Sequence, residues 1–377
     1  MSYRTPSELT LLAVIVKPFA VLSMIGSVLI IRDILIDPPK RALTYHRILF
    51  GLSSIDVCTA FWFFLSTWAI PEGTDDIPLA AGTAGSCRAQ GWFISLNIAS
   101  PLYNVSLCIY YLLMIKYKWT QDQIKFKASP WLLGAPLVFG LSVAFAGLSM
   151  NLYAPATMWC WVAAHPAGCS GSECDGHSGQ ANDFRFAFFY GPLWTAILSM
   201  GAIMTIVYAA IKKGEGTDAF GSETSTDFFW LISKERRGEE VSQNDRSRRL
   251  ARQAFWYCAA FLLTWIWPTL VRVWEISGSP PFVFYVMMAL FAPLQGLMNF
   301  ISYIRPRYLR NKDLHPNWNL YEVLTTVDPD EDFKLGAMRM REEMPMTNND
   351  NGEDEVDTTN VNFNIDDEDM KKDIEIT

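Results

Sequence analysis

Histidines are few in this sequence, and ionisable residues are rare within its apolar stretches. The 377 residues include 4 histidines, and charged residues make up 19% of the chain against 50% for hydrophobic ones. No histidine lies within an apolar stretch, so the clustered ligands of a membrane metal hydrolase are missing. No nucleophile motif or nucleotide-binding loop is present either. We therefore expect no enzyme activity, no catalytic residue, no cofactor, no metal site and no nucleic-acid partner.

Two further absences narrow the class of membrane protein. The last apolar stretch, Phe282–Ile304, contains no lysine, and a retinal protein needs one there for its Schiff base. No internal repeat of the kind that marks many transporters is visible. Asp56 is nearly the only charge deep within an apolar stretch. A retinal protein is not expected, and a small-solute transporter stays as an alternative.

Seven apolar stretches are long enough to cross a bilayer, which takes about 20 helical residues. Prolines interrupt several of them, which membrane helices tolerate because neighbouring groups satisfy the freed carbonyls. The first stretch is too long for the apolar part of a signal peptide, so we interpret it as a membrane helix that acts as its own signal. The sequence predicts an all-α, multi-pass protein, a bundle of seven transmembrane helices at Leu9–Ile31, Ile48–Ile70, Trp92–Tyr117, Trp131–Leu152, Phe184–Ile211, Ala254–Trp274 and Phe282–Ile304.

Lysine and arginine are concentrated in alternate loops. The segments after the first, third, fifth and seventh stretches are rich in both, whereas the alternate loops offer only Arg88 and, at the far end of another, Arg185. Because positively charged loops stay in the cytosol, the amino terminus is predicted outside and the carboxyl terminus inside. Lys17 is discordant within the first helix, and we expect it to reach toward the interface or to face the bundle.

The charge of the chain is divided between a body and a tail. From Asp328 onward there are 17 acidic and 5 basic residues, a net charge of −12 against −8 for the whole chain. Such a segment has little apolar surface to bury. We predict an extracellular amino terminus at 1–8, a transmembrane domain at 9–324 and a disordered acidic cytoplasmic tail at 325–377. Pro306–Leu324 is expected to form an amphipathic helix on the inner membrane surface.

Four of the seven cysteines fall on the predicted outer side. They are Cys87, Cys160, Cys169 and Cys174. An even set in an oxidising compartment implies disulfides, with three possible connectivities. We favour Cys87–Cys160, which would tie the third helix to the second outer loop, and Cys169–Cys174 as a local loop. A zinc site that combines the second pair with two nearby histidines is the alternative.

Motifs along the apolar stretches resemble those of G-protein-coupled receptors. Asp56, Trp267-Pro268 and the pair Asn299 and Tyr303 follow the spacing of class A receptors. The Asp/Glu-Arg-Tyr signature of that class is missing, and Tyr111-Leu112-Leu113 occupies its place. The chain is more similar to cyclic AMP receptors of the slime-mould type and their fungal, plant and protist relatives. The motifs that carry this similarity are Gln90-Gly91-Trp92, Ile109-Tyr110-Tyr111-Leu112, Trp159-Cys160-Trp161, Tyr190-Gly191-Pro192-Leu193-Trp194, Pro268 with Arg272, and Pro293-Leu294-Gln295-Gly296.

The resemblance implies a plasma-membrane receptor that senses an extracellular ligand or stimulus. It would activate a heterotrimeric G protein by rearrangement of its sixth helix. A seven-helix protein without such coupling is the alternative, beside the transporter. The resemblance also implies a switch in a polar pocket around Asp56, although a neutral structural role for this residue stays open. The predicted switch residues are Asp56, Ser27, Asn299, Tyr303, Pro268 and Trp265.

The resemblance further suggests sites at the two ends of the bundle. The predicted ligand site comprises Trp92, Asn97, Arg185, Tyr190, Trp194, Trp267, Arg272 and Glu275. The arginines could accept a phosphate, or Arg272 and Glu275 could simply pair with each other. The predicted G-protein contact comprises Lys116, Lys118, Arg246, Arg248, Arg249, Arg252 and Arg307, which also suit contact with anionic membrane lipid. Phosphorylation by a receptor kinase, with recruitment of an arrestin-like protein, is expected at Ser222, Thr224, Ser225, Thr226, Thr347, Thr358 and Thr359.

Overall fold

The computed structural model of the chain describes residues 5–75, 77–166, 169, 173–175, 177–215, 243–317 and 319. These residues belong to one compact unit, Met1–Thr326. The predicted acidic tail at 325–377 lies outside the described residues, as do all the expected phosphorylation sites. The side chain of Arg246 is outside them as well.

Seven helical spans long and apolar enough to cross a membrane are present in the described part of the chain, as predicted. The first starts at a capping box, in which Thr5 and Glu8 satisfy each other's backbone N–H groups. Several spans combine more than one regular element, because short turns alter a helix without ending the crossing. The helical elements are α1 (Pro6–Ile36), α2 (Pro38–Ala42), α3 (Thr44–Leu65), η1 (Ser66–Ala69), α4 (Ala84–Leu96), α5 (Ala99–Ile115), α6 (Gln121–Gln123), η2 (Ile124–Ala128), α7 (Ser129–Ser149), η4 (Ser178–Gln180), α8 (Ala181–Arg185), η5 (Phe186–Tyr190), α9 (Gly191–Glu215), α11 (Gln243–Ser277), α12 (Phe282–Phe291), η6 (Ala292–Leu294) and α13 (Gln295–Leu314).

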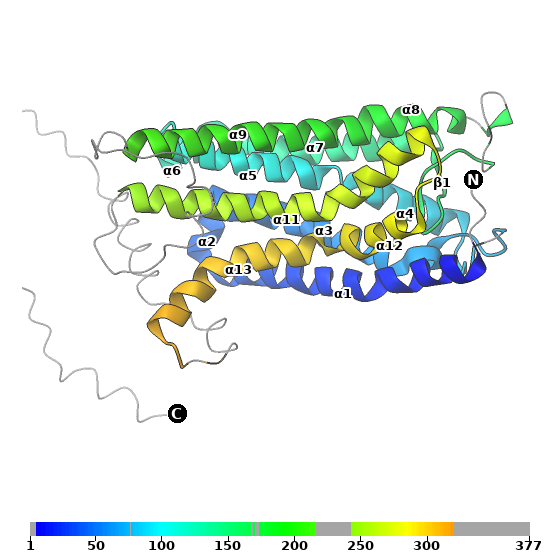
Figure 1. Ribbon diagram of the computed structural model, residues 1–377. Helices are drawn as coiled ribbons and strands as arrows, with labels where there is room; N and C mark the ends of the chain where they lie inside the picture. The colour runs from blue at the N-terminus through cyan, green and yellow to red at the C-terminus, as the bar shows by residue number, and fades with distance from the viewer. Residues whose placement is uncertain are drawn as a thin grey trace, which may run out of the picture. The chain divides into compact units, whose positions relative to one another are not determined.

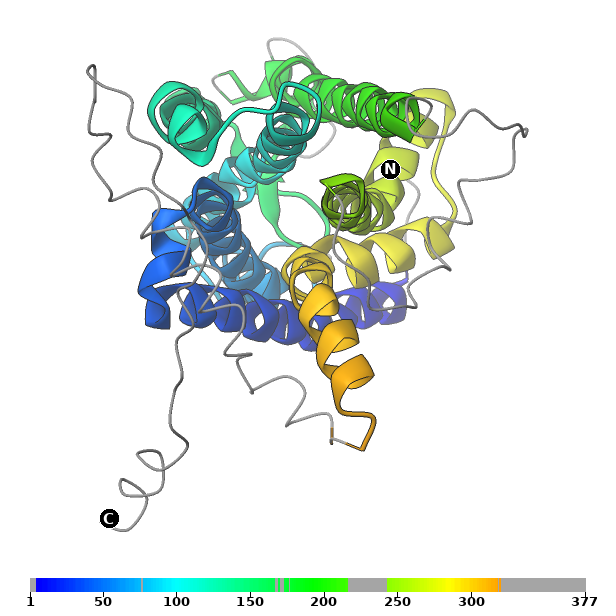
Figure 2. The same cartoon turned by 90° about the vertical axis from the view of Figure 1, so that its left-hand side faces the viewer.

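The spans lie side by side as one bundle (Figure 1). Viewed along its length, α1 packs between α3 and α13, and α5 lies toward the middle, in contact with α3, α7, α9 and α11 (Figure 2). At one end of the bundle lies an antiparallel hairpin of β1 (Tyr153–Pro155) and β2 (Cys160–Val162). We call this the hairpin end. The opposite end carries α2 and α6, and we call it the α2 end.

Three helices depart from straight geometry. The third span breaks between α4 and α5 at Asn97 and Ile98. The sixth, α11, contains Pro268 and changes direction toward the hairpin end (Figure 1), because proline removes a backbone hydrogen bond and its ring clashes with the preceding turn. The seventh passes through the short turn η6, which contains Pro293.

The segment predicted as a separate amphipathic helix continues the seventh span instead. Residues up to Leu314 belong to α13, with Pro306 inside it. The last part of α13 leans away from the bundle (Figure 2). Most of the remaining residues of the predicted helix, from Trp318 on, lie outside the described residues, so its amphipathic role stays a prediction.

Candidate functional site

The hairpin is fixed to the bundle by covalent and polar contacts. Cys87 of α4 forms a disulfide with Cys160 of β2, and Cys169 forms one with Cys174, as the sequence favoured. The buried Gln90 amide donates to the Trp62 and Ser66 carbonyls at 2.9 Å each. Its carbonyl accepts the N–H of Cys160 at 2.6 Å. One side chain therefore joins the end of α3, α4 and the hairpin.

Below the hairpin lies an arginine surrounded by aromatic rings. The Nε of Arg272, on α11, donates to the Tyr190 hydroxyl at 3.1 Å, and its guanidinium forms an ion pair with Glu275. The guanidinium carbon lies 5.5 Å from the ring centroid of Trp161, a residue of β2. The Tyr285 hydroxyl donates to Glu275 at 3.1 Å. We call Arg272, Glu275, Tyr190, Trp161 and Tyr285 the arginine cluster, and it joins α11, η5, β2 and α12.

The other predicted ligand residues divide into two groups. Arg185 donates to Asn182 and lies near enough to Arg272 and Glu275 to interact with their charges. Trp194 lies against Tyr190, with ring centroids 6.0 Å apart. In contrast, Trp92 contacts Phe145 of α7, and Trp267 stacks on Phe291 of α12. These contacts do not place Trp92 or Trp267 in the arginine cluster.

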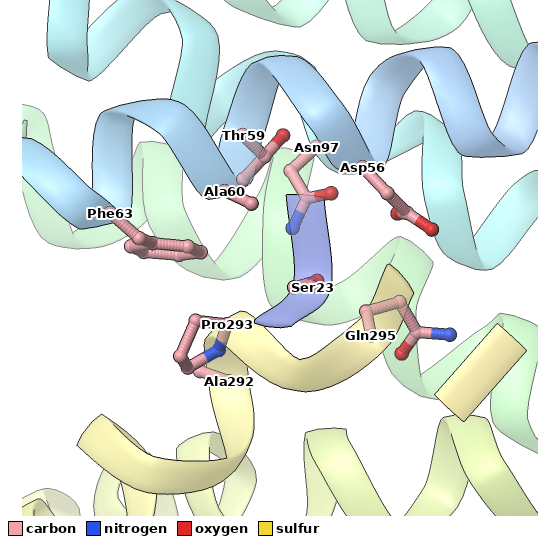
Figure 3. Close-up of a pocket in the computed structure, with 9 residues that line it drawn as sticks. All are labelled: Ser23, Asp56, Thr59, Ala60, Phe63, Asn97, Ala292, Pro293 and Gln295. Carbon is pink, nitrogen blue, oxygen red and sulfur yellow. The ribbon is translucent and has the colours of Figure 1, made fainter. Parts of the chain in front are cut away.

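A small pocket lies between α3, α4, α1 and η6, deeper in the bundle (Figure 3). Asp56 lines it together with Ser23, Thr59, Ala60, Phe63, Asn97, Ala292, Pro293 and Gln295. The Asp56 carboxylate is 3% exposed and accepts from the Asn299 amide at 2.8 Å and from the Ser100 hydroxyl at 3.1 Å. Asn97, expected in the ligand site, is a member of this pocket instead, because the break after α4 turns it toward α1 and η6.

The hydrogen bonds around Asp56 continue to α11. The Gln295 amide donates to Asn299 at 3.1 Å, and the Thr264 hydroxyl donates to Gln295 at 2.5 Å. A continuous chain of side chains therefore links α3, α13 and α11. We call Asp56, Ser100, Asn299, Gln295 and Thr264 the polar chain.

Ser27 does not join the polar chain, contrary to the prediction that it would be a partner of Asp56. Its hydroxyl is buried and has no hydrogen-bond partner among the residues that the structure describes. A Cβ added to Gly296 would lie 2.1 Å from that hydroxyl, so the two helices approach closely here. Ser23, one turn earlier, accepts the N–H of Gly296 at 2.9 Å. Ser27 therefore marks the close packing of α1 on α13.

Trp265 lies between the two sites. Its ring centroid is 5.9 Å from that of Phe189 and 6.1 Å from that of Phe261. The indole is 7% exposed, and its N–H has no hydrogen-bond partner in the described part of the chain. Trp265 is thus a packed core residue one turn from Pro268.

At the α2 end, Tyr303 is held by a carboxylate that the sequence did not single out. Its hydroxyl donates to Asp33 of α1 at 2.5 Å. Asp33 also pairs with Lys40 at 2.9 Å and with Arg307 at 3.4 Å. Arg307, expected at the G-protein surface, is therefore partly committed to a contact between α1 and α13.

A group of tyrosines occupies the place of the missing Asp/Glu-Arg-Tyr signature. The hydroxyls of Tyr45 and Tyr257 lie 3.1 Å apart, and the Gln253 amide donates to Tyr45 at 2.6 Å. The ring of Tyr45 lies 6.0 Å from each of Tyr110 and Tyr111. These contacts join α3, α5 and α11. We call the five residues the tyrosine cluster.

Most of the expected G-protein residues lie near this cluster. Lys116 and Lys118 directly follow α5 and are exposed, as is Arg249 near the start of α11, whereas Arg248 and Arg252 are half-buried. The α2 end therefore presents basic side chains around the tyrosine cluster.

Lys17 has a structural role that explains why a charged residue lies within the first span. Its ammonium donates to the Phe64 carbonyl at 2.9 Å and to the Leu65 carbonyl at 3.4 Å, where α3 ends. It also lies 3.3 Å from the ring centroid of Trp68. Of the two predicted positions for Lys17, the structure shows the one that faces the bundle.

Sequence reasoning missed residues that have no distinctive local pattern. Ser100, Thr264, Asp33, Tyr45 and Gln253 are ordinary polar residues within or beside apolar stretches. Gln295 and Trp161 stand inside motifs that carried the family resemblance, which was a usable signal. For the others, only the packing of distant helices shows that they share one cluster.

The chain is similar to known receptors in sequence and in fold. No protein-family model matches the sequence. The ascaroside receptor GPR3 of the fungus Arthrobotrys oligospora is 22% identical over 331 residues, which cover 71% of this chain and 76% of that receptor. Squid rhodopsin shares the fold with a TM-score of 0.56 at 11% identity, covering 92% of this chain and 95% of the rhodopsin chain.

These comparisons confirm the resemblance to G-protein-coupled receptors and the seven-helix, multi-pass membrane fold. The curated relative is a receptor rather than an enzyme. The likeness to rhodopsin concerns the fold alone, since Phe282–Ile304 has no lysine for a retinal Schiff base. The similarity to cyclic AMP receptors stays a prediction.

Proposed function

We propose that this chain is a plasma-membrane G-protein-coupled receptor, in which a ligand at the hairpin end shifts α11 and opens the α2 end to a heterotrimeric G protein. The observation that carries the proposal is the polar chain. It joins α3 and α13 to α11 between the two ends through buried hydrogen bonds. A ligand that contacts α11 at Arg272 can therefore bias the packing of all three helices, provided that it binds one packing more tightly than the other.

We infer that the hairpin end faces the outside. Both disulfides lie there, and disulfides persist in oxidising compartments. Lys40, Lys116 and Arg249 lie at the α2 end, where the positive-inside rule places the cytosol. A fluorescence-quenching assay on tags at each terminus of the intact chain in cells tests this orientation.

The arginine cluster is the proposed ligand site, and its charge favours an acidic group on the ligand. Arg185 and Arg272 lie near each other, and Glu275 is the carboxylate whose charge acts on both. Arg185, Arg272 and Glu275 together therefore carry a net charge of +1. The aromatic rings of Trp161, Tyr190 and Trp194 would border the rest of such a ligand. Ascarosides, for which the fungal relative is named, are one class to include in a ligand screen.

The basic residues at the α2 end are the proposed G-protein surface. Lys116, Lys118 and Arg249 are exposed there and carry the same charge. They suit an acidic partner surface, and contact with anionic lipid uses the same chemistry. Receptor kinase and arrestin-like partners remain proposals for the phosphorylatable residues outside the described part of the chain.

Nucleotide exchange on a co-expressed G protein tests the proposed function. Membranes that contain the chain are incubated with a panel of G proteins and a slowly hydrolysed GTP analogue, while small organic acids and their matched neutral amides are screened. We expect an acid from the panel to increase exchange. A triple alanine variant of Lys116, Lys118 and Arg249 should lose the response while keeping its thermal stability.

The alternative functions predict other results. A small-solute transporter would accumulate a labelled solute in vesicles without any nucleotide exchange. A seven-helix protein without coupling would bind a ligand, seen as a rise in the melting temperature, with exchange unchanged across the whole panel of G proteins. Either result would contradict the receptor proposal.

A further inference from the structure

The tyrosine cluster lies where class A receptors carry their charged signature. Tyr111 occupies that place in the sequence and is 1% exposed. Around it, Tyr45 from α3 meets Tyr257 and Gln253 from α11 through the contacts of 3.1 Å and 2.6 Å. Tyr257 is 2% exposed, so its contact with Tyr45 is shielded from water. Asp33 and Arg307, the nearby charged pair, join α1 to α13.

The direction of these bonds matters for the movement of α11. The bonds of Tyr45 cross from α3 to α11 near the α2 end, on the far side of Pro268 from the arginine cluster. If α11 swings outward about Pro268, Tyr257 and Gln253 leave Tyr45, and two buried or half-buried hydrogen bonds are lost. Each such bond favours the closed packing by a factor of about three to ten.

From this geometry we propose that Tyr45, Tyr257 and Gln253 form a neutral lock that holds α11 in the closed, resting packing. The lock lies beside Tyr111, which stands at the place of the charged Asp/Glu-Arg-Tyr signature. It rests on the proposed function in one respect, because it assumes that α11 is the helix that opens. Since the lock contains no charge, salt has little effect on its strength, whereas an ion pair would weaken as ionic strength rises.

A native pair of thiols reports the separation of α5 and α11 without any G protein. The Sγ atoms of Cys108 and Cys258 lie 3.4 Å apart, and Cys258 follows Tyr257 directly in the chain. Molecular iodine can oxidise them: the two thiols lose two electrons and two protons, the S–S bond forms, and iodine leaves as two iodide ions. A disulfide needs the sulfurs within bonding distance, so opening of α11 slows the reaction.

The cross-link is detected by cleaving the chain with a protease and testing whether the two fragments stay together. A protease site inserted between residues 216 and 242 separates α9 from α11. Cys258 lies in the second fragment, whereas the four cysteines of the two existing disulfides all lie in the first. The free Cys58 also lies in the first fragment, so fragments that stay together on a non-reducing gel carry a bond from Cys258, and C108S, which removes its neighbour at 3.4 Å, supplies the blank.

Two conservative variants test the lock, with a matched control. Y45F and Y257F remove hydroxyls of the lock, whereas Y103F removes a hydroxyl that donates to the Leu133 carbonyl at 3.0 Å and joins α5 to α7. We expect Y257F, which removes one bond, to raise the open fraction and hence basal nucleotide exchange about three- to tenfold, and Y45F, which removes both bonds, to raise it about ten- to a hundredfold. The cross-link should slow in proportion to the closed fraction that is lost, more in Y45F than in Y257F. Y103F should change neither. Q253L removes the bond from Gln253 to Tyr45. It is used in place of Y45F or Y257F if either of those variants does not fold.

A rescue experiment separates the lock from a general loss of stability. Iodine treatment of Y45F should return its basal exchange to the wild-type level, because the new bond closes α11, and a reductant should restore the raised exchange. If Y45F, Y257F and Q253L give the same cross-link rate and the same basal exchange as Y103F, the lock is overturned. If the cross-link slows but no G protein ever exchanges nucleotide, the lock is supported and the proposed coupling to a G protein is contradicted.

Discussion

Asp56 and Asn299 are 243 positions apart in the sequence and are joined by a hydrogen bond of 2.8 Å. The contact ties α3 to α13 near the middle of the bundle, where each unsatisfied polar group is costly. The second partner of the carboxylate is Ser100 of α5. One acidic side chain therefore holds three spans in a fixed relation, and its contacts reach α11 through Gln295.

Replacing Asp56 with alanine should destabilise the bundle and abolish its response. The substitution leaves the Asn299 amide and the Ser100 hydroxyl without their acceptor, at a cost of about 1–3 kcal/mol for each buried group. We expect the melting temperature in detergent to fall by several degrees and the ligand-dependent exchange to be lost. Ser54→Ala is the control, since Ser54 lies on the same helix and bonds only the Phe50 carbonyl on an exposed face. Equal melting temperatures for the two variants would contradict this account.

The two disulfides should contribute unequally to stability. Cys87–Cys160 closes 73 residues and Cys169–Cys174 closes 5. The chain-entropy relation gives about 4 kcal/mol for the long loop and about 2 kcal/mol for the short one. We therefore expect the double serine variant of Cys87 and Cys160 to melt well below that of Cys169 and Cys174. Thermal denaturation of the purified chain measures both, and the reverse order would show that the hairpin is held without the covalent bond.

Gln90→Leu should loosen the hairpin while the disulfide stays intact. The variant keeps the volume of the side chain but removes the Gln90 hydrogen bonds to the Trp62 and Ser66 carbonyls and to the Cys160 N–H. The Trp62 carbonyl still accepts the Ser66 N–H. We expect faster hydrogen exchange at residues 153–162, measured by mass spectrometry. The neighbouring exposed Arg88→Ala should exchange like the wild type. Unchanged protection in Gln90→Leu would mean that the disulfide alone positions β2.

Loss of Arg272 should affect both the stability of the protein and its ligand response, whereas loss of Arg185 should affect only the ligand response. Arg272 bonds Tyr190 and Glu275, so Arg272→Gln should lower both the melting temperature and the ligand response. Arg185 donates to Asn182, one turn away on its own helix. Arg185→Gln should leave the melting temperature unchanged. It should lower the potency of an acidic ligand about tenfold or more, since hydrogen bonds to charged groups contribute about 1.5–3 kcal/mol.

The measurement for this pair is a concentration–response curve for nucleotide exchange, taken with the most active acid from the screen and with its neutral amide. The response to the amide should be the same in the wild type and in Arg185→Gln. A loss of potency that is equal for acid and amide would remove Arg185 from the site of charge recognition.

The seven spans and the disulfide pairing were predictable from the sequence. A helix crossing a bilayer satisfies its own backbone hydrogen bonds, so about 20 apolar residues are sufficient to predict each span. The pairing of Cys87 with Cys160 was favoured because both lie on the predicted outer side, one at the third helix and the other in the second outer loop, and the structure has this disulfide. Asn299 was correctly placed near Asp56, because the spacing within two motifs resembles that of known receptors.

Only the tertiary structure decided which polar side chains meet. Ser27 and Ser23 lie one turn apart on α1, yet the Ser23 hydroxyl bonds Gly296 while the Ser27 hydroxyl bonds none of the described residues. Tyr45 meets Tyr257 across 212 positions. A membrane helix is apolar all round, so its sequence shows that it crosses the bilayer but not which face turns inward. Rotation and contact depth come from the packing of neighbouring helices, and these decide which residues form the arginine cluster, the polar chain and the tyrosine cluster.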